Sequence, residues 1–218
     1  MMKIGISCRI DEAVNYFEVR NALSADWISY FNSLNYYPIL IPNGLSDIDK
    51  YLNNLELDGI ILSGGNNVNP ILYDSNIKMN SVYDSRDKSE IKIITYALNN
   101  KLPLLGICRG MSIINIYFQG SLTHNIDNHV NVNHKIIIQE FHHYFDREKI
   151  VNSFHNHGTR EHNVGADLRI FAKSKDGYVE GIYNLDKLIF GIQWHPERRP
   201  RDTQIDNFIT DVFRKNIR

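Results

Sequence analysis

Cys108 stands where the sequence is best suited to present a nucleophile. It follows the apolar run of residues 102–107 and precedes the helical pattern of residues 111–119, so it lies on a tight turn from strand to helix. Gly106 and Gly110 let the backbone bend there and let a substrate approach. Helix N–H groups and a nearby histidine both favour the ionised, reactive form of a thiol. The turn therefore predicts an enzyme.

A histidine and a carboxylate follow the last predicted strand, in the segment Gln193-Trp-His-Pro-Glu. His195 and Glu197 are two residues apart, which places both side chains on one face if strand geometry continues. Such a histidine can accept a thiol proton and return it to a leaving amine, while the carboxylate orients the imidazole. Alone, this segment is typical of a surface turn. Together with Cys108 it predicts a catalytic triad.

Two successive glycines, Gly64 and Gly65, come directly after another predicted strand. Backbone N–H groups at such a position can face a ligand without interference from side chains. We predict an oxyanion hole formed by the backbone N–H groups of Gly65 and Arg109.

The elements that must position these residues alternate as in an α/β protein. Apolar runs at residues 4–7, 37–41, 59–62 and 104–107 predict parallel strands, and helical spacing covers residues 23–34 and 88–98. Closely spaced strands are expected at residues 132–139, 150–153, 168–172, 178–183 and 188–193, as a mixed or antiparallel extension, before a final helix at residues 202–216. We expect a single domain over residues 1–218, with the ligand site at the carboxyl ends of the strands.

Composition narrows the class of protein. The formal net charge is -1, from 24 basic and 25 acidic residues, so no sequence-wide field favours nucleic acid or an anionic membrane. Two cysteines do not make a disulfide framework, and we interpret Cys8 as an inert buried residue at a strand end. Neither a signal peptide nor an apolar run of about 18 residues is apparent. We expect a cytoplasmic protein.

Four separated segments together resemble the class I glutamine amidotransferase-like γ-glutamyl hydrolases. They are residues 61–70, 103–111, 151–157 and 191–197, in the order of that family. The resemblance implies a flavodoxin-like fold and a triad with Cys108 as nucleophile, His195 as general acid/base and Glu197 as orienter. It also implies attack on a γ-glutamyl amide, a γ-glutamyl thioester, and release of an amine before water frees glutamate. No cofactor is implied.

The resemblance has departures that concern substrate recognition. The family usually has glutamine where this chain has Ser112, so binding of the glutamyl group is expected to be altered, and free glutamine to be a poor substrate. By the resemblance, Gly64, Ser112, Ser153, Phe154 and His155 are candidate binding residues, although the chain departs from the family pattern just after His155.

Arginines near the triad could hold an anionic leaving group. Arg198, Arg199 and Arg201 follow the triad carboxylate, and Arg9 could reach the same region. A phosphate-bearing leaving group would suit them, whereas a solvated turn explains them equally well. Tyr73, Tyr83 and Arg86 could form another wall of the site or pack a loop.

Eight of the nine histidines lie between His124 and His162. We expect no metal site, because His124, His129 and His134 do not share one helix or strand face. His142 and His143 are interpreted as surface residues.

The leading hypothesis is a hydrolase acting on a small γ-glutamyl conjugate, with γ-glutamyl-CDP-amidate, as in capsule phosphoramidate synthesis, as one candidate. The alternatives are a γ-glutamyl-γ-aminobutyrate hydrolase of polyamine breakdown and a glutaminase subunit that passes ammonia to a separate synthase. A degenerate binding scaffold is disfavoured by the intact triad. The sequence leaves the oligomeric state open.

Overall fold

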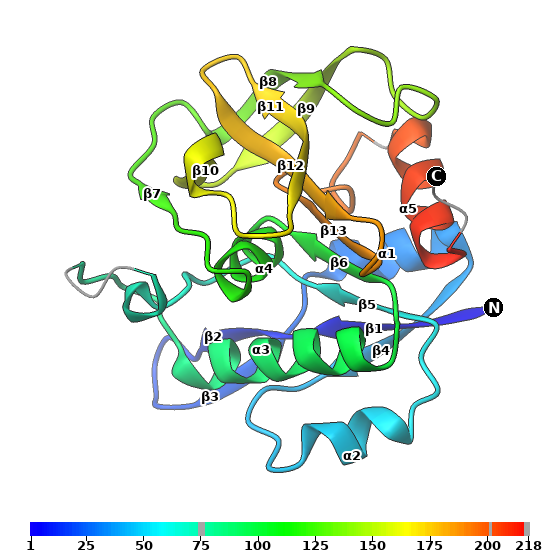
Figure 1. The fold of residues 1–218 in the computed structure, drawn as a ribbon. Coiled ribbons are helices and arrows are strands. Elements are labelled where there is room, and N and C mark those ends of the chain that lie inside the picture. Colours follow the sequence, from blue (N-terminus) through cyan, green and yellow to red (C-terminus); the bar gives the residue numbers. More distant parts are fainter. Residues whose placement is uncertain (74–76, 201, 216–218) are drawn as a thin grey trace.

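The computed structural model describes residues 1–73, 77–200 and 202–215, and it forms an α/β sandwich around one continuous sheet (Figure 1). The strands of the sheet and its small companion strands are β1 (Met2–Ser7), β2 (Arg9–Glu12), β3 (Val19–Ala22), β4 (Tyr36–Ile41), β5 (Gly59–Leu62), β6 (Leu104–Ile107), β7 (Thr123–His124), β8 (Val130–Ile138), β9 (Glu148–Phe154), β10 (His157–Arg160), β11 (Arg169–Ser174), β12 (Tyr178–Asn184) and β13 (Ile189–Ile192). The helices are α1 (Ala25–Leu34), α2 (Ile48–Asn53), α3 (Asp84–Asn99), α4 (Arg109–Tyr117) and α5 (Thr203–Phe213).

The sheet has a parallel half and an antiparallel half, as predicted. Its order is β4-β1-β5-β6-β13-β12-β11-β8-β9. Pairing is parallel from β4 to β13 and antiparallel from β13 to β9. Since β13 belongs to both halves, the segment that follows it lies where the two halves meet.

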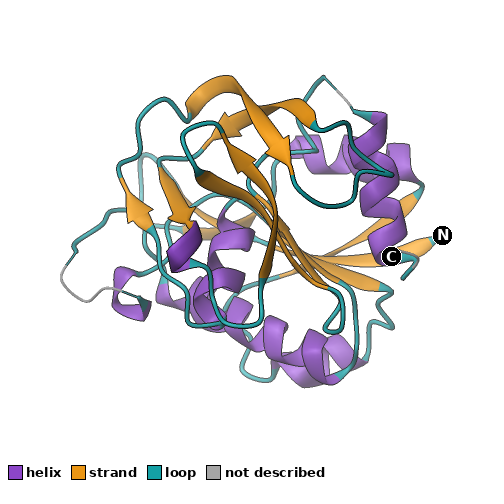
Figure 2. Cartoon of the chain, turned by 45° about the horizontal axis from the view of Figure 1, so that its top comes forward, coloured by secondary structure: helices purple, strands orange, loops and turns teal. Residues whose placement is uncertain are grey.

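Helices cover both faces of the parallel half (Figure 2). One face packs against α2, α3 and α4, and the other against α1 and α5 together with aromatic residues of the antiparallel half. α1 begins at the cap Ser24 and ends at Asn35, whose φ of 57° closes the helix in the left-handed conformation. The apolar faces of α1, α3, α4 and α5 have helical spacing in the sequence, which is why these helices could be predicted, whereas the six-residue α2 was not predicted.

The hairpin of β2 and β3 was not predicted from the sequence. Its strands are four residues long and mostly exposed or half-buried, so they carry no alternating apolar pattern. Cys8, between β1 and β2, is buried as expected, and burial raises its thiol pKa. No helix among the described residues combines the length and apolar character that a membrane crossing requires.

Candidate active site

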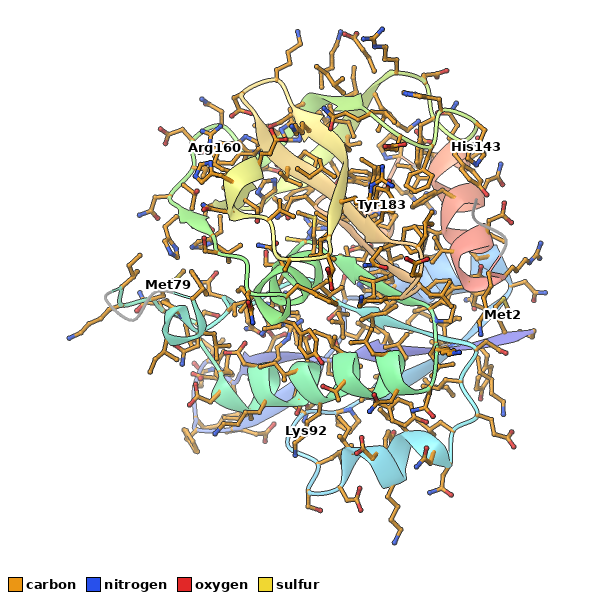
Figure 3. The ribbon with its side chains drawn as sticks, viewed as in Figure 1. Met2, Met79, Lys92, His143, Arg160 and Tyr183 are labelled. Atoms are coloured by element: carbon orange, nitrogen blue, oxygen red, sulfur yellow. The ribbon has the colours of Figure 1, made fainter. Side chains whose placement is uncertain are left out.

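Three strand ends meet at one cavity of about 340 Å³, as the sequence predicted. The ends of β5, β6 and β13 contribute the glycine pair, the cysteine turn and the histidine segment. Met79, from the loop before α3, also lines the cavity, and Figure 3 shows this loop at the edge of the molecule. The predicted site residues that line the cavity are Gly64, Gly65, Cys108, Arg109, Ser112, Phe154, His155, His195, Glu197 and Arg198.

Cys108 occupies a strained turn. It precedes the first residue of α4 with φ 53° and ψ −106°, a combination that L-residues rarely adopt, and its backbone N–H donates to the carbonyl of Ile192 at 2.8 Å. The flanking glycines serve close packing. A Cβ on Gly110 would lie 2.1 Å from the carbonyl oxygen of Leu62, and one on Gly106 would lie 2.4 Å from Gly110. The helix can therefore press its N-terminus, with Cys108, against the sheet.

The side chain of His195 is hydrogen-bonded to both Cys108 and Glu197. Its Nδ1 lies 2.6 Å from Glu197 Oε1. Burial lowers the pKa of His195, but the charges and hydrogen bonds of Cys108 and Glu197 outweigh burial and raise that pKa to about 10. The imidazole is thus held as imidazolium between a sulfur and a carboxylate.

The prediction that His195 and Glu197 share one face of a continuing strand is wrong. β13 ends at Ile192, so these residues do not share a strand face but lie in the turn that follows. Asn152 of β9 holds this turn through two hydrogen bonds of 2.8 Å with the backbone of His195. The backbone N–H of His195 donates to Oδ1 of Asn152, and Nδ2 of Asn152 donates to the carbonyl of His195. The sequence analysis did not assign Asn152 a role, although it lies in the third resembling segment.

The glycine pair lies directly against the reactive groups. A Cβ on Gly64 would be 2.7 Å from Cε1 of His195 and 3.5 Å from Cβ of Cys108, so a larger residue would displace the imidazole. Gly65 has φ +83°, which glycine adopts without strain. An oxyanion hole formed by the N–H groups of Gly65 and Arg109 stays a prediction.

Arg86 is buried beneath the glycine turn and is not a wall of the cavity. Its guanidinium donates to the carbonyls of Ser63, Gly64 and Gly65 at 2.8, 3.0 and 2.7 Å, and to Glu90 at 3.1 Å. The side chain of Arg109 is also buried, in ion pairs with Asp87 and Glu90. Burial lowers the pKa of Arg86 to about 10. For Glu90, burial acts upward, but the two arginines bring its pKa below the ordinary value.

This network could have been noticed in the sequence. Its charged members on α3, Arg86, Asp87 and Glu90, are spaced at i, i+1 and i+4, and Ser89 beside them is buried too. Charges that fall on the buried face of an amphipathic helix indicate an internal ion-pair network. Of the other two candidate wall residues, Tyr73 lines the cavity, while Tyr83 donates to Glu12.

The candidate binding residues divide into two groups. Ser112, Phe154 and His155 line the cavity. Ser153 does not, which corrects the prediction: its side chain is fully buried and donates to the carbonyl of His129 at 2.6 Å. Because side chains alternate along β9, Ser153 points to the opposite side from Phe154.

The candidate arginines also differ in whether they line the cavity. Arg198 lines the cavity, with its guanidinium carbon 3.8 Å from the centre of the Phe154 ring, and that ring meets His195 edge-on. Arg9 lines the same cavity beside Gly65 and pairs with Asp11. Arg199 is exposed and is not among the described lining residues, which corrects its assignment. Arg201 lies outside the described residues.

The fold and the cysteine, histidine and glutamate of this cavity define a class of hydrolase related to glutamine amidotransferases. Residues 3–197 match the pattern of the family Peptidase C26, and the chain belongs to that family.

Relatives with named activities cover most of the chain. The γ-glutamyl-CDP-amidate hydrolase of Campylobacter jejuni is 35% identical over 200 residues, with 90% of each chain covered. The γ-glutamyl-γ-aminobutyrate hydrolase of Escherichia coli is 28% identical over 207 residues, covering 81% of this chain and 78% of its own. A solved glutamine amidotransferase from Thermotoga maritima shares the fold with a TM-score of 0.61 at 14% identity, covering 100% of this chain and 86% of its own. The chain is a hydrolase of this fold.

Proposed function

We propose that this chain hydrolyses a γ-glutamyl amide whose leaving group carries a diphosphate, of the γ-glutamyl-CDP-amidate type, and releases L-glutamate. The Campylobacter relative supports the substrate class by its name and its similarity. The placement of positive charge in the cavity supports it from the residues of this chain.

One observation carries the choice of leaving group. Two guanidinium groups, those of Arg198 and Arg9, line the cavity, the second of them also paired with Asp11. Glu197 is the single acidic residue among the described lining residues and is already bound to His195. Guanidinium groups bind phosphate oxygens through several donors at once. An anionic leaving group therefore meets complementary charge next to the reactive sulfur.

The proposed chemistry proceeds in two halves. The thiolate of Cys108 bonds to the amide carbon, and the resulting oxyanion accepts hydrogen bonds from the N–H groups of Gly65 and Arg109. The carbon–nitrogen bond then breaks while His195 gives its proton to the leaving nitrogen, which leaves a γ-glutamyl thioester. A water molecule attacks that thioester, His195 accepts the water proton, and the sulfur departs as thiolate. The balance is one water consumed for each glutamate and each amidate released.

Arg198 and its neighbour Arg199 form a matched pair for the test. With γ-glutamyl-CDP-amidate, we expect Arg198→Ala to lower kcat/KM by about 10- to 100-fold, the loss of a charge-assisted contact. With glutamine, the same variant should stay within about threefold of the parent, because ammonia makes no such contact. Arg199→Ala should change neither value. Released glutamate is the readout, and equal losses on both substrates in Arg198→Ala would contradict the assignment.

A third substrate separates the rival activities. γ-Glutamyl-γ-aminobutyrate carries a carboxylate in place of the diphosphate, and the Escherichia coli relative is named for it. Faster turnover of that conjugate than of the diphosphate conjugate by the parent chain would favour the γ-aminobutyrate reaction. Glutamine turnover exceeding both would favour a glutaminase role.

A further inference from the structure

Three buried side chains from distant segments converge behind the wall of the active-site cavity. His129 precedes β8, His155 follows β9 and Glu180 lies on β12. Their exposed fractions are 2%, 6% and 0%. Nδ1 of His129 lies 3.3 Å from Nε2 of His155, and each of these atoms lies 3.7 Å from Oε1 of Glu180. The spacing of His124, His129 and His134 does not reveal this cluster, because His155 and Glu180 lie in distant segments of the sequence.

The outer hydrogen bonds fix which ring nitrogens carry protons. Nδ1 of His155 lies 2.8 Å from the carbonyl oxygen of His157, which can only accept, so Nδ1 donates. Nε2 of His129 lies 3.0 Å from Oδ2 of Asp176 and donates to that carboxylate. In neutral rings, the lone pairs of the other two nitrogens then point into the cluster. A carbonyl or carboxylate holding the outer N–H is the usual arrangement around a metal-bound histidine.

Glu180 adds a third acceptor. Both of its carboxylate oxygens are buried and make no hydrogen bond of good geometry among the described residues, and the nearest ring nitrogen outside the cluster is Nε2 of His134, 3.4 Å from Oε1. A buried carboxylate without donors is costly unless a cation balances it. Three lone-pair donors that face one another therefore form an arrangement that a cation would stabilise.

The spacing fits a tetrahedral zinc ion. Zinc–nitrogen bonds of about 2.0 to 2.1 Å place neighbouring ligand atoms about 3.3 to 3.4 Å apart. The nitrogen–nitrogen separation of 3.3 Å and the nitrogen–oxygen separations of 3.7 Å are close to this ligand–ligand distance. His134 of β8 is a neighbour of the cluster, with Nε2 3.4 Å from Oε1 of Glu180, but the ligand atoms that lie within 4.8 Å of one another belong to His129, His155 and Glu180. With Glu180 and Asp176 both ionised, a divalent cation leaves the cluster neutral.

We propose that His129, His155 and Glu180 bind a structural Zn²⁺ ion that fastens the wall of the active-site cavity. All three ligands are buried and the hydrolytic groups are those of Cys108, His195 and Glu197, so the ion holds structure and takes no part in the hydrolysis, with a water molecule as its fourth ligand. It would tie the ends of β8 and β9 to β12. The fastened segment includes Phe154, which contacts both His195 and Arg198.

The test uses the full chain, stripped with EDTA and titrated with ZnCl₂ alone. The Cys108→Ser variant removes the catalytic thiol, which could itself bind zinc. We expect this variant to bind about one Zn²⁺ per chain with a Kd below micromolar and to gain several degrees in Tm. Failure of the folded Cys108→Ser chain to bind zinc saturably would overturn the proposal and would favour a shared proton in the cluster.

Substitutions in the Cys108→Ser background locate the ion. Glu180→Gln and His129→Gln should each weaken zinc binding by more than about 100-fold, and Asp176→Asn by about 10- to 100-fold as an outer partner. His143→Gln is the control, because His143 is exposed beside α5 at the periphery (Figure 3). Zinc affinity unchanged in Glu180→Gln would overturn the assignment. If the ligand variants do not fold, Co²⁺ titration of Cys108→Ser decides: strong visible d–d bands indicate tetrahedral ligands, and an octahedral spectrum contradicts them.

Discussion

Arg86 donates through Nη1 to the carbonyl oxygen of Gly65 at 2.7 Å, from inside the protein and 21 residues further along the chain. Nη2 of the same guanidinium holds the carbonyls of Ser63 and Gly64. A peptide unit is planar and contains the carbonyl of one residue and the N–H of the next. Holding the carbonyl of Gly64 on the inner side therefore also fixes the direction of the N–H of Gly65. Arg86 is therefore a positioning residue for the N–H groups of the glycine turn.

Replacing Arg86 by lysine keeps the charge and removes the planar set of donors. We expect Arg86→Lys to lower kcat by about 10- to 100-fold with a smaller change in KM, because misdirected oxyanion donors act mainly on the transition state. The free energy of unfolding should fall by about 3 kcal/mol, as for a broken buried network. Arg169→Lys, at an exposed ion pair with Glu140, is the control. A kcat equal to that of the parent would show that the turn holds its geometry without the guanidinium.

Cys108 combines catalysis with backbone strain, and two substitutions separate these properties. Cys108→Ala and Cys108→Gly should both reduce glutamate release by at least about 10⁴-fold, since no nucleophile remains. Glycine adopts a φ of 53° with little strain whereas alanine does not, so Cys108→Gly should be the more stable variant by about 1 kcal/mol. Urea unfolding of the two proteins measures the difference. Equal stability would mean that the turn carries no strain.

The raised pKa of His195 sets the alkaline limit of the reaction. The imidazolium must be present to protonate the leaving nitrogen, so kcat/KM should hold from neutral pH to about 9 and decline as the pH rises through about 10. Between about pH 6.5 and about pH 10, His195 binds a proton in the folded chain that it does not bind in the unfolded chain, so the contribution of His195 to stability is full below 6.5 and is lost as the pH rises through 10.

A pH profile of glutamate release, together with urea unfolding at pH 7 and 9.5, measures both effects. His195→Asn is the control, and its unfolding should lack this part of the pH dependence. A decline of kcat/KM between pH 6 and 8 would show instead that His195 titrates at its ordinary pKa and is not stabilised by Cys108 and Glu197.

Local pattern predicted much of the scaffold. The strands at residues 59–62 and 104–107 were predicted with the bounds that the structure has, because both are short buried runs between turn signals. The cysteine turn was found because an apolar strand, the cysteine and the start of a helix follow one another directly in the chain. The short β7 and β10 were missed because neither strand, Thr-His and His-Gly-Thr-Arg, contains a large apolar residue.

The sequence by itself determined which groups can do chemistry: a cysteine at a helix start, a histidine with a carboxylate two residues on, and a glycine pair after a strand. Only the tertiary structure decided how they are held. Asn152 fixes the His195 turn, Arg86 fixes the glycine turn, and Ser153 faces His129 instead of the cavity. The physical reason is range. Strand and helix periodicity act over a few residues, whereas a buried polar group takes whichever partner the packing of distant strands brings within hydrogen-bonding distance.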